Sequence, residues 1–196
     1  MPVRPAPEPA GRPTPLPRPG RGASRRRRAE ILRVDHAGEY AAVHIYRAQQ
    51  AVFQGRAGKD AIAADMGEMQ GQEAVHLARF DALLNAERVR PTVMTPVWRL
   101  AALGLGAGTA LLGEKAAHAC TEAVESVIEE HYADQIAELQ DRDPELAAEL
   151  TKFRDEELAH HDHAVEHGSR DAPGYGLLSA VIRAGCRAAI KISERV

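Results

Sequence analysis

The amino-acid sequence predicts an all-α protein with one globular domain. Ala, Leu, Glu and Arg, which favour helices, are abundant, whereas aromatic residues make up only 4% of the chain. No segment alternates apolar and polar residues between turn residues, as a strand with one buried face does. A length of 196 residues, a hydrophobic fraction of 44% and a net charge of −3 fit a soluble-type globular composition with a sizeable core.

Six segments of helical periodicity follow one another from Ala29 onward, separated by breaks that contain Gly or Pro. The predicted helices span residues 29–53, 59–88, 95–112, 114–140, 144–167 and 174–194. Cys120 and Cys186 each stand alone in a helix. The sequence therefore indicates neither a disulfide framework nor a zinc site of the CxxC type.

Residues 1–28 differ from the rest of the chain in composition. They hold eight of the twelve prolines and eight arginines against one acidic residue. We expect a disordered basic arm here, with the folded domain over residues 29–196. The arm lacks the apolar core of a secretory signal, and its prolines disfavour the helix of a mitochondrial presequence. Contact with anionic lipid and a solvated tail without function both remain open.

Two of the predicted helices each carry a Glu and a His three residues apart. These pairs are Glu73 with His76 in the second helix and Glu157 with His160 in the fifth. Residues three apart share one helix face, so each pair can bind one metal ion. An ExxH match is weak evidence by itself, because Glu and His are common in this chain.

The order of these residues along the chain is stronger evidence. Glu39 precedes Glu73 by 34 residues, and Glu125 precedes Glu157 by 32. The chain thus contains two copies of one unit, a helix with a single core-facing Glu followed by a helix with ExxH. Ferritin-like bundles that bind two metal ions use this ligand set. The sequence predicts a ferritin-like four-helix bundle of the first, second, fourth and fifth helices, with the metal ligands Glu39, Glu73, His76, Glu125, Glu157 and His160.

The charges of this set also favour metal binding. Four carboxylates in one core would repel each other without metal, whereas two divalent cations balance them. Carboxylate and imidazole ligands together suit iron or manganese. Asp35 and Asp155, which lie near proposed ligands in the sequence, are expected to accept hydrogen bonds from the ligand imidazoles. Glu122 shares a helix face with Glu125 and is the alternative to it.

Four of the other histidines are expected to be exposed or to be hydrogen-bonded locally. They are His44, His118, His163 and His167.

The third and sixth helices have apolar surfaces that the bundle does not need. The segment "VWRLAALGLGAGTALLG" carries one charge, Arg99, and is too short and too rich in glycine for a membrane span. The sixth helix combines apolar residues with a basic stripe of Arg183, Arg187, Lys191 and Arg195. We expect both helices to lie at a membrane interface. The alternative is close packing of the third helix and a solvated basic face on the sixth.

Several segments resemble the demethoxyubiquinone hydroxylase family. They are "RVDHAGEY", "RVRPTVMTPVW", "GAGTALLG", "HYADQI", "FRDEELAHHD" and "AGCRAAI", and they occur in the family's order from about Ile31 to Val196. The resemblance implies a di-iron monooxygenase that hydroxylates a polyprenylated 3-methyl-6-methoxy-1,4-benzoquinol (demethoxyubiquinol), a late step of ubiquinone biosynthesis. It implies the same six ligands, with Glu73 and Glu157 as bridging candidates. It also implies that His131 and Tyr132 relay electrons or protons.

The same resemblance implies cofactors and partners. These are two Fe ions per chain, O2 as co-substrate and NADH as a candidate electron donor, although the sequence has no nucleotide-binding motif. The polyprenyl quinol would stay partly in membrane lipid while its head enters a hydrophobic tunnel beside the third and sixth helices. A lipid-binding accessory protein of the pathway and a homo-oligomer are further candidate partners, and no nucleic acid is expected.

The resemblance and the composition together also indicate a location. We expect a peripheral protein on the cytoplasmic side of a bacterial inner membrane, with the matrix side of the mitochondrial inner membrane as the alternative. Isoprenoid length and the physiological electron donor are left open by the sequence.

Two other classes of protein could share this pattern. An iron-storage or ferroxidase protein of ferritin type would have the same ligands but a hydrophilic exterior, against which the third and sixth helices argue. A bundle with purely structural carboxylates would bind no metal.

Overall fold

The computed structural model describes residues 25–196, and every regular element in this range is helical. The elements are α1 (Arg25–Phe53), α2 (Asp60–Glu87), α3 (Thr95–Leu112), α4 (Glu114–Leu139), α5 (Pro144–Glu166), the short 3-10 helix η1 (Ser169–Asp171) and α6 (Tyr175–Ser193). The all-α prediction is confirmed. Apart from the start of α1, each helix begins and ends within one residue of its predicted boundary.

Helix α1 begins at Arg25, four residues earlier than predicted. Arg27 forms an ion pair with Glu138 of α4 at 3.0 Å, and Arg28 forms one with Glu87 of α2 at 2.5 Å. These carboxylates come from distant parts of the chain, so composition alone did not reveal that this basic run is ordered. The rest of the predicted disordered arm lies outside the described residues.

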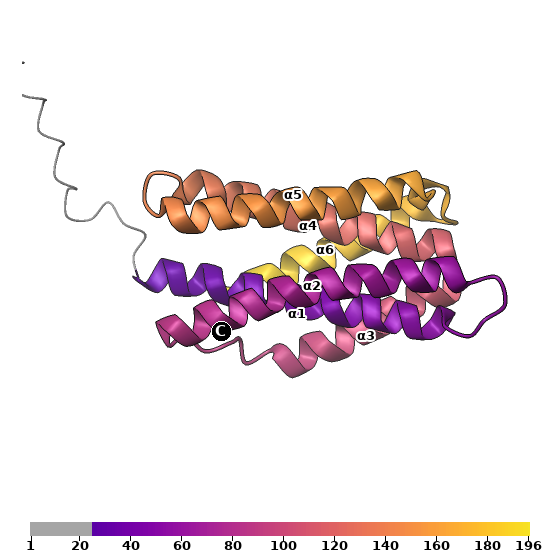
Figure 1. Cartoon of the computed structure of the whole chain (residues 1–196), viewed down its shortest axis with the longest axis horizontal. Helices are drawn as coiled ribbons and strands as arrows, with labels where there is room; N and C mark the ends of the chain where they lie inside the picture. The colour runs from indigo at the N-terminus through magenta and orange to yellow at the C-terminus, as the bar shows by residue number, and fades with distance from the viewer. Residues whose placement is uncertain (1–24) are drawn as a thin grey trace, which may run out of the picture.

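Two antiparallel helix pairs build the bundle. Helix α1 packs along α2, and α4 packs along α5, while α3 lies on α1 and α6 lies on α4. Figure 1 shows the α4–α5 pair above the α1–α2 pair, with α3 along the lower edge. This arrangement confirms the predicted ferritin-like bundle of α1, α2, α4 and α5, with α3 and α6 added outside it.

Two apolar clusters occupy the bundle interior, on either side of a central polar layer. One cluster includes Leu32, Phe80 and Leu139, and the other includes Phe53 and Met66. Each fully buried side chain of this kind stabilises the fold by about 1.5–3 kcal/mol. These clusters offset the cost of burying carboxylates between them.

Helix α3 packs closely against α1 because of Gly106. A Cβ atom at this position would lie 2.3 Å from the Ile45 carbonyl oxygen, so only glycine permits the contact. The opposite face of α3 is exposed, with Leu100 73% and Leu112 69% accessible. Close packing and an outward apolar face therefore occur in the same helix. Within the described residues, no helix is long and apolar enough to cross a membrane.

Candidate metal centre

The six predicted ligand residues meet in the middle of the bundle. The four helices α1, α2, α4 and α5 each contribute at least one of them, and none is more than 5% exposed. They form two groups, in each of which the potential ligand atoms lie within 4.8 Å of one another. The groups are Glu39, Glu73, His76 and Glu157, and Glu73, Glu125, Glu157 and His160.

Two carboxylates belong to both groups. Glu73 and Glu157 thus lie where each could contact two cations, whereas Glu39 and Glu125 each belong to one group. A pair of shared carboxylates with one further Glu and one His on each side is the geometry of the di-metal carboxylate bundles.

The hydrogen bonds of the cluster leave atoms available for metal. Within the described residues, one oxygen of each of the four carboxylates has no hydrogen bond, and neither does Nδ1 of His76. An unpaired buried polar atom costs about 1–3 kcal/mol. Divalent cations coordinated by these atoms would remove that cost, so the residues present fit a pair of metal ions.

Two tyrosines orient the unshared carboxylates. The Tyr132 hydroxyl donates a hydrogen bond to Oε1 of Glu39, and the Tyr46 hydroxyl donates one to Oε1 of Glu125. Each tyrosine lies seven residues after the single Glu of its own helix and binds the Glu of the other helix. In both carboxylates the remaining oxygen, Oε2, is the one without a hydrogen bond.

Burial and neighbouring charges shift the pKa values of the side chains in this centre. Burial raises the pKa values of Glu39 and Glu125 well above their usual range. Burial would also raise the pKa of Glu73, but the adjoining imidazoles of His160 and His76 hold it at about 2. Although burial disfavours the His160 cation, the adjoining carboxylates raise its pKa to about 10. The metal-free centre therefore retains protons that bound cations would displace.

Each ligand imidazole is held by a residue from the opposite helix pair. Nδ1 of His76 lies 3.2 Å from Oε1 of Glu157, and its Nε2 lies 2.6 Å from Oε2 of Glu156. Nδ1 of His160 lies 3.0 Å from Oε1 of Glu73, and its Nε2 lies 2.5 Å from Oε1 of Gln72. The raised pKa values of both histidines keep Nδ1 protonated in the metal-free centre. A bound cation would displace this proton and take the Nδ1 lone pair, while Nε2–H stays hydrogen-bonded to Glu156 or Gln72.

The prediction that Asp35 and Asp155 hold these imidazoles is wrong. Asp155 is exposed and pairs with Arg154 at 2.7 Å, and Asp35 accepts a hydrogen bond from Gln135 at 2.8 Å. The partners of an imidazole come from the helix that faces it, not from its own neighbourhood in the sequence. Gln72 and Glu156 were missed for this reason, although each directly precedes the Glu of an ExxH pair.

Glu122 is not part of the centre, so the expectation that it could replace Glu125 is wrong. Its carboxylate accepts hydrogen bonds from the Tyr175 hydroxyl at 2.8 Å and from Nε of Arg170 at 3.1 Å. Although burial would raise the pKa of Glu122, hydrogen bonds from Ser169, Tyr175 and Arg170 lower it. Glu122 therefore ties α4 to η1 and α6.

The two predicted relay residues lie at one side of the centre. Tyr132 contacts Glu39 directly, while Nε2 of His131 lies 3.4 Å from Oδ1 of Asp35 and 2.9 Å from Nε2 of Gln135. His131 is only partly buried, so its side chain lies between solvent and the buried carboxylate of Asp35, one helical turn before Glu39 on α1.

An apolar cavity of about 380 Å³ lies between α3 and α6 and the two bundle helices α1 and α4, which carry Glu39 and Glu125. It is lined by residues of α1, α3, α4 and α6, among them Gly38 beside Glu39 and Val124 beside Glu125. Trp98 and Val181 line it farther out, on α3 and α6. The predicted hydrophobic tunnel thus has a counterpart in the structure.

Comparison with known protein families places this chain in one family. Residues 26–193 match the family model described as "Ubiquinone biosynthesis protein COQ7". The chain belongs to this family. This membership confirms the resemblance found in the sequence.

Relatives in this family are similar over most of their length. A mouse protein named "NADPH-dependent 3-demethoxyubiquinone 3-hydroxylase, mitochondrial" is 50% identical over 169 residues, which cover 84% of this chain and 76% of the mouse protein. A Rhodospirillum rubrum protein named "3-demethoxyubiquinol 3-hydroxylase" is 50% identical over 166 residues, which cover 85% and 77% of the two chains. The chain is accordingly an oxidoreductase, a hydroxylase of ubiquinone biosynthesis.

Proposed function

We propose that this COQ7-family chain binds two iron ions and uses O2 to hydroxylate demethoxyubiquinol. The ligands are Glu39, Glu73, His76, Glu125, Glu157 and His160. The observation that carries the proposal is an apolar cavity lined by the two helices that supply Glu39 and Glu125, with the sequence neighbours of these two residues, Gly38 and Val124, in its lining. An iron-storage protein has no use for such a cavity, and neither does a bundle with structural carboxylates.

The cavity suits the head of a quinol with a long tail. Its lining is almost entirely apolar, and such a pocket excludes the water that would compete with the substrate. Gly38 exposes bare backbone to open space there, since a Cβ atom at this position would meet nothing within 4 Å. The aromatic ring can therefore approach the centre from the side of Glu39 and Glu125.

Iron, when bound, supplies the activation of O2, and the chain's own residues control the surroundings. Tyr132 and Tyr46 orient Glu39 and Glu125, and Glu156 and Gln72 orient the two imidazoles. One oxygen atom enters the ring C–H bond, and the other leaves as water after uptake of two electrons and two protons. The group of His131, Asp35 and Tyr132 is suited to carry those protons from solvent.

The electrons are proposed to come from a reduced nicotinamide. The sequence suggested NADH, whereas the names of the mouse and human relatives specify NADPH. NADPH is therefore the first donor to assay.

Membrane association is proposed from the outer faces of α3 and α6. Leu100, Leu177 and Val181 are between 62% and 75% exposed, and they lie on the two helices that line the cavity. Apolar residues of this kind beside a basic stripe favour the surface of an anionic bilayer. Arg187 of the stripe forms an ion pair with Glu130 at 2.9 Å, so part of the stripe also contacts the bundle.

The proposed location is the membrane that carries the quinone. This is a bacterial inner membrane or, as in relatives named mitochondrial, a mitochondrial membrane. A lipid-binding accessory protein and self-association are further expected partners.

Two measurements test this function together. Anaerobically reconstituted protein should contain two irons per chain, and a cell lacking the protein should accumulate demethoxyubiquinone. Wild-type protein should restore ubiquinone, and Glu157→Ala should not. Normal ubiquinone in the deleted cell would contradict the proposed substrate, and fewer than two irons would contradict the proposed cofactor.

A further inference from the structure

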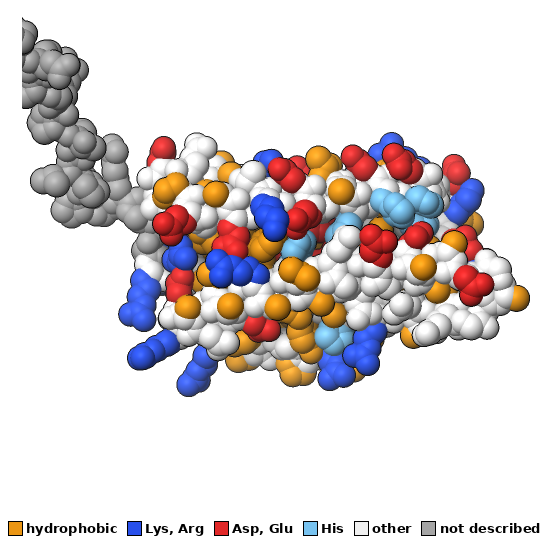
Figure 2. Space-filling view, in the orientation of Figure 1, with side chains coloured by type: hydrophobic (Ala, Val, Ile, Leu, Met, Phe, Trp, Pro, Cys, Tyr) orange, Lys and Arg blue, Asp and Glu red, His pale blue; other side chains and the backbone are white. Residues whose placement is uncertain are grey.

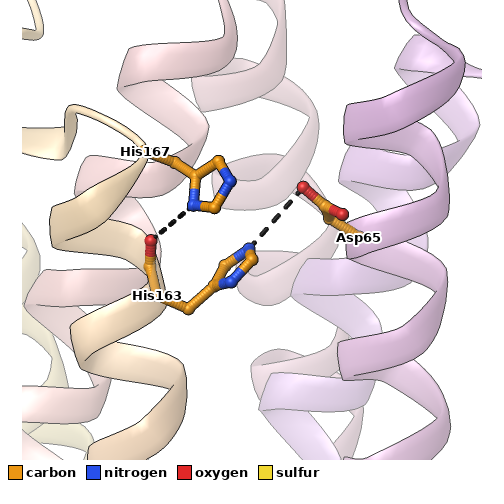
Figure 3. Close-up of side chains that lie close together, drawn as sticks. All are labelled: Asp65, His163 and His167. Carbon is orange, nitrogen blue, oxygen red and sulfur yellow. Dashed lines mark hydrogen bonds and ion pairs between the residues drawn. The ribbon is translucent and has the colours of Figure 1, made fainter.

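A second cluster of metal-binding side chains lies outside the carboxylate centre, between α5 and α2. His163 lies in the last turn of α5 and His167 directly follows that helix, four residues farther along, while Asp65 faces them from α2 (Figure 3). In the space-filling view, histidine side chains gather on this part of the surface beside acidic ones (Figure 2). Asp65 and His163 are half-buried and His167 is exposed. The cluster is therefore open to solvent.

We propose that Asp65, His163 and His167 form an accessory site for a first-row divalent transition metal. Two imidazoles and one carboxylate with open coordination positions suit such ions. One potential ligand atom of each residue lies within 4.8 Å of the other two. The site does not depend on the function proposed for the carboxylate centre.

The distance between Asp65 and His163 favours a shared cation over a direct contact. Nε2 of His163 lies 3.6 Å from Oδ2 of Asp65, too far for a hydrogen bond. Within the described part of the chain this nitrogen has no hydrogen-bond partner. Zinc lies about 2.0–2.2 Å from imidazole nitrogen and carboxylate oxygen, so two of its ligands are typically about 3–4 Å apart.

The two imidazoles are oriented for binding from the same side. Nδ1–H of His167 donates a hydrogen bond of 2.8 Å to the His163 carbonyl oxygen, which leaves the Nε2 lone pair available. The rings of His163 and His167 stack with centroids 4.0 Å apart and an angle of 28°. Figure 3 shows both rings on the side of α5 that faces Asp65.

A third histidine lies beneath this pair. The ring of His118, on α4, lies 5.2 Å from that of His167 and is only 3% exposed. Burial, with added repulsion from His167 and His163, lowers the pKa of His118 to about 4, so its imidazole is neutral. Its Nδ1 is buried without a hydrogen-bond partner among the described residues. The prediction that His118 is exposed or satisfied locally is wrong.

Equilibrium dialysis of the whole chain against Co²⁺ tests the accessory site. We expect wild-type protein to bind one Co²⁺ more than either His163→Ala or Asp65→Asn, whatever the occupancy of the carboxylate centre. His161→Ala is the matched control, because this neighbouring histidine of α5 contacts Asp162 at 3.0 Å and is not in the cluster. It should bind as much Co²⁺ as the wild type.

Anomalous diffraction at the cobalt edge gives the position of the additional ion. A peak between Asp65 and His163 supports the site. Equal Co²⁺ content in the wild type and both cluster variants would overturn the proposal, as would a loss of Co²⁺ in the His161→Ala control equal to theirs. These results remain distinguishable from a failure of the carboxylate centre, which would lower the metal content of all four proteins alike.

Discussion

The two halves of the chain, α1 to α3 and α4 to α6, build the same unit with different surroundings. Each half supplies a single Glu, an ExxH pair, a tyrosine seven residues after the single Glu, and an outer helix. The tyrosines and the residues that hold the imidazoles are exchanged between the halves. Neither half can therefore form the centre by itself.

The differences between the halves give the centre two distinct sides. The residue six positions after the single Glu is Ile45 in the first half, where it lines the cavity, and His131 in the second half, where it contacts Asp35. The imidazole partner is the neutral Gln72 in one case and the carboxylate of Glu156 in the other. The halves are thus alike at the proposed ligands and unlike in the residues that line the proposed routes for substrate and protons.

The largest expected effect is the loss of iron when a carboxylate that belongs to both ligand groups is replaced, compared with one that belongs to a single group. Glu157→Gln should lose both irons and all measurable activity, because Glu157 belongs to both ligand groups. Glu39→Gln and Glu125→Gln should each lose about one iron. Iron analysis with circular dichroism as a folding control checks this, and equal iron loss in the three variants would show that the carboxylates are not divided in this way.

The next effect concerns the partners of the imidazoles. Glu156→Gln should weaken metal binding about 10- to 100-fold, because such partners orient the imidazole and raise its basicity. Gln72→Glu, the reciprocal change, should strengthen binding on the His160 side, since an ionised acceptor makes a stronger hydrogen bond. Metal titration of the two single variants and the double exchange measures both. If the Glu156→Gln variant binds metal as tightly as the wild type, the difference between the two imidazole partners, Glu156 and Gln72, has no effect on metal affinity.

A smaller effect is expected from filling the cavity. Gly38→Leu places a side chain in the open space beside Glu39 and should lower kcat/KM at least about tenfold, or about 1.4 kcal/mol, with two irons retained. Gly71→Leu on α2 is the matched control, because it also replaces an uncrowded helical glycine, outside the cavity lining. Steady-state kinetics checks the pair, and unchanged kcat/KM in Gly38→Leu would place the substrate elsewhere.

The smallest effect is a dependence of metal-free stability on pH. In the folded protein the pKa of His160 is raised to about 10, compared with about 6.5 in the unfolded chain. The protonated His160 therefore stabilises the fold fully below about pH 6.5, and this stabilisation is lost as the pH rises toward 10. The raised pKa values of Glu39 and Glu125 act in the same direction. We expect the free energy of unfolding to fall by about 1 kcal/mol or more between pH 6.5 and 10. Urea unfolding in chelator measures this; a rise in stability over that range would refute these shifts.

Some features could be predicted from the sequence because they depend on local spacing. The helix boundaries follow from Gly and Pro breaks, and the order of the single Glu and ExxH residues identifies which side chains meet. Glu156 and Gln72 could not be assigned, because the register between antiparallel helices decides which residue faces an imidazole. For the same reason the sequence did not indicate that Asp65 of α2 lies opposite His163 and His167, which were expected only to be exposed or hydrogen-bonded locally.

The start of α1 shows a second limit of the sequence. The run of arginines before Ala29 has the composition of a disordered arm, yet Arg27 and Arg28 pair with carboxylates of α4 and α2. Only the tertiary arrangement brings these charges together.

The central claim is that the two halves meet at a pair of iron ions. Anomalous diffraction at the iron edge from anaerobically reconstituted protein tests it most directly. The account predicts two peaks about 3.5–4 Å apart, both contacted by Glu73 and Glu157, with His76 at one and His160 at the other. A single peak, or an iron pair away from these carboxylates, would contradict it.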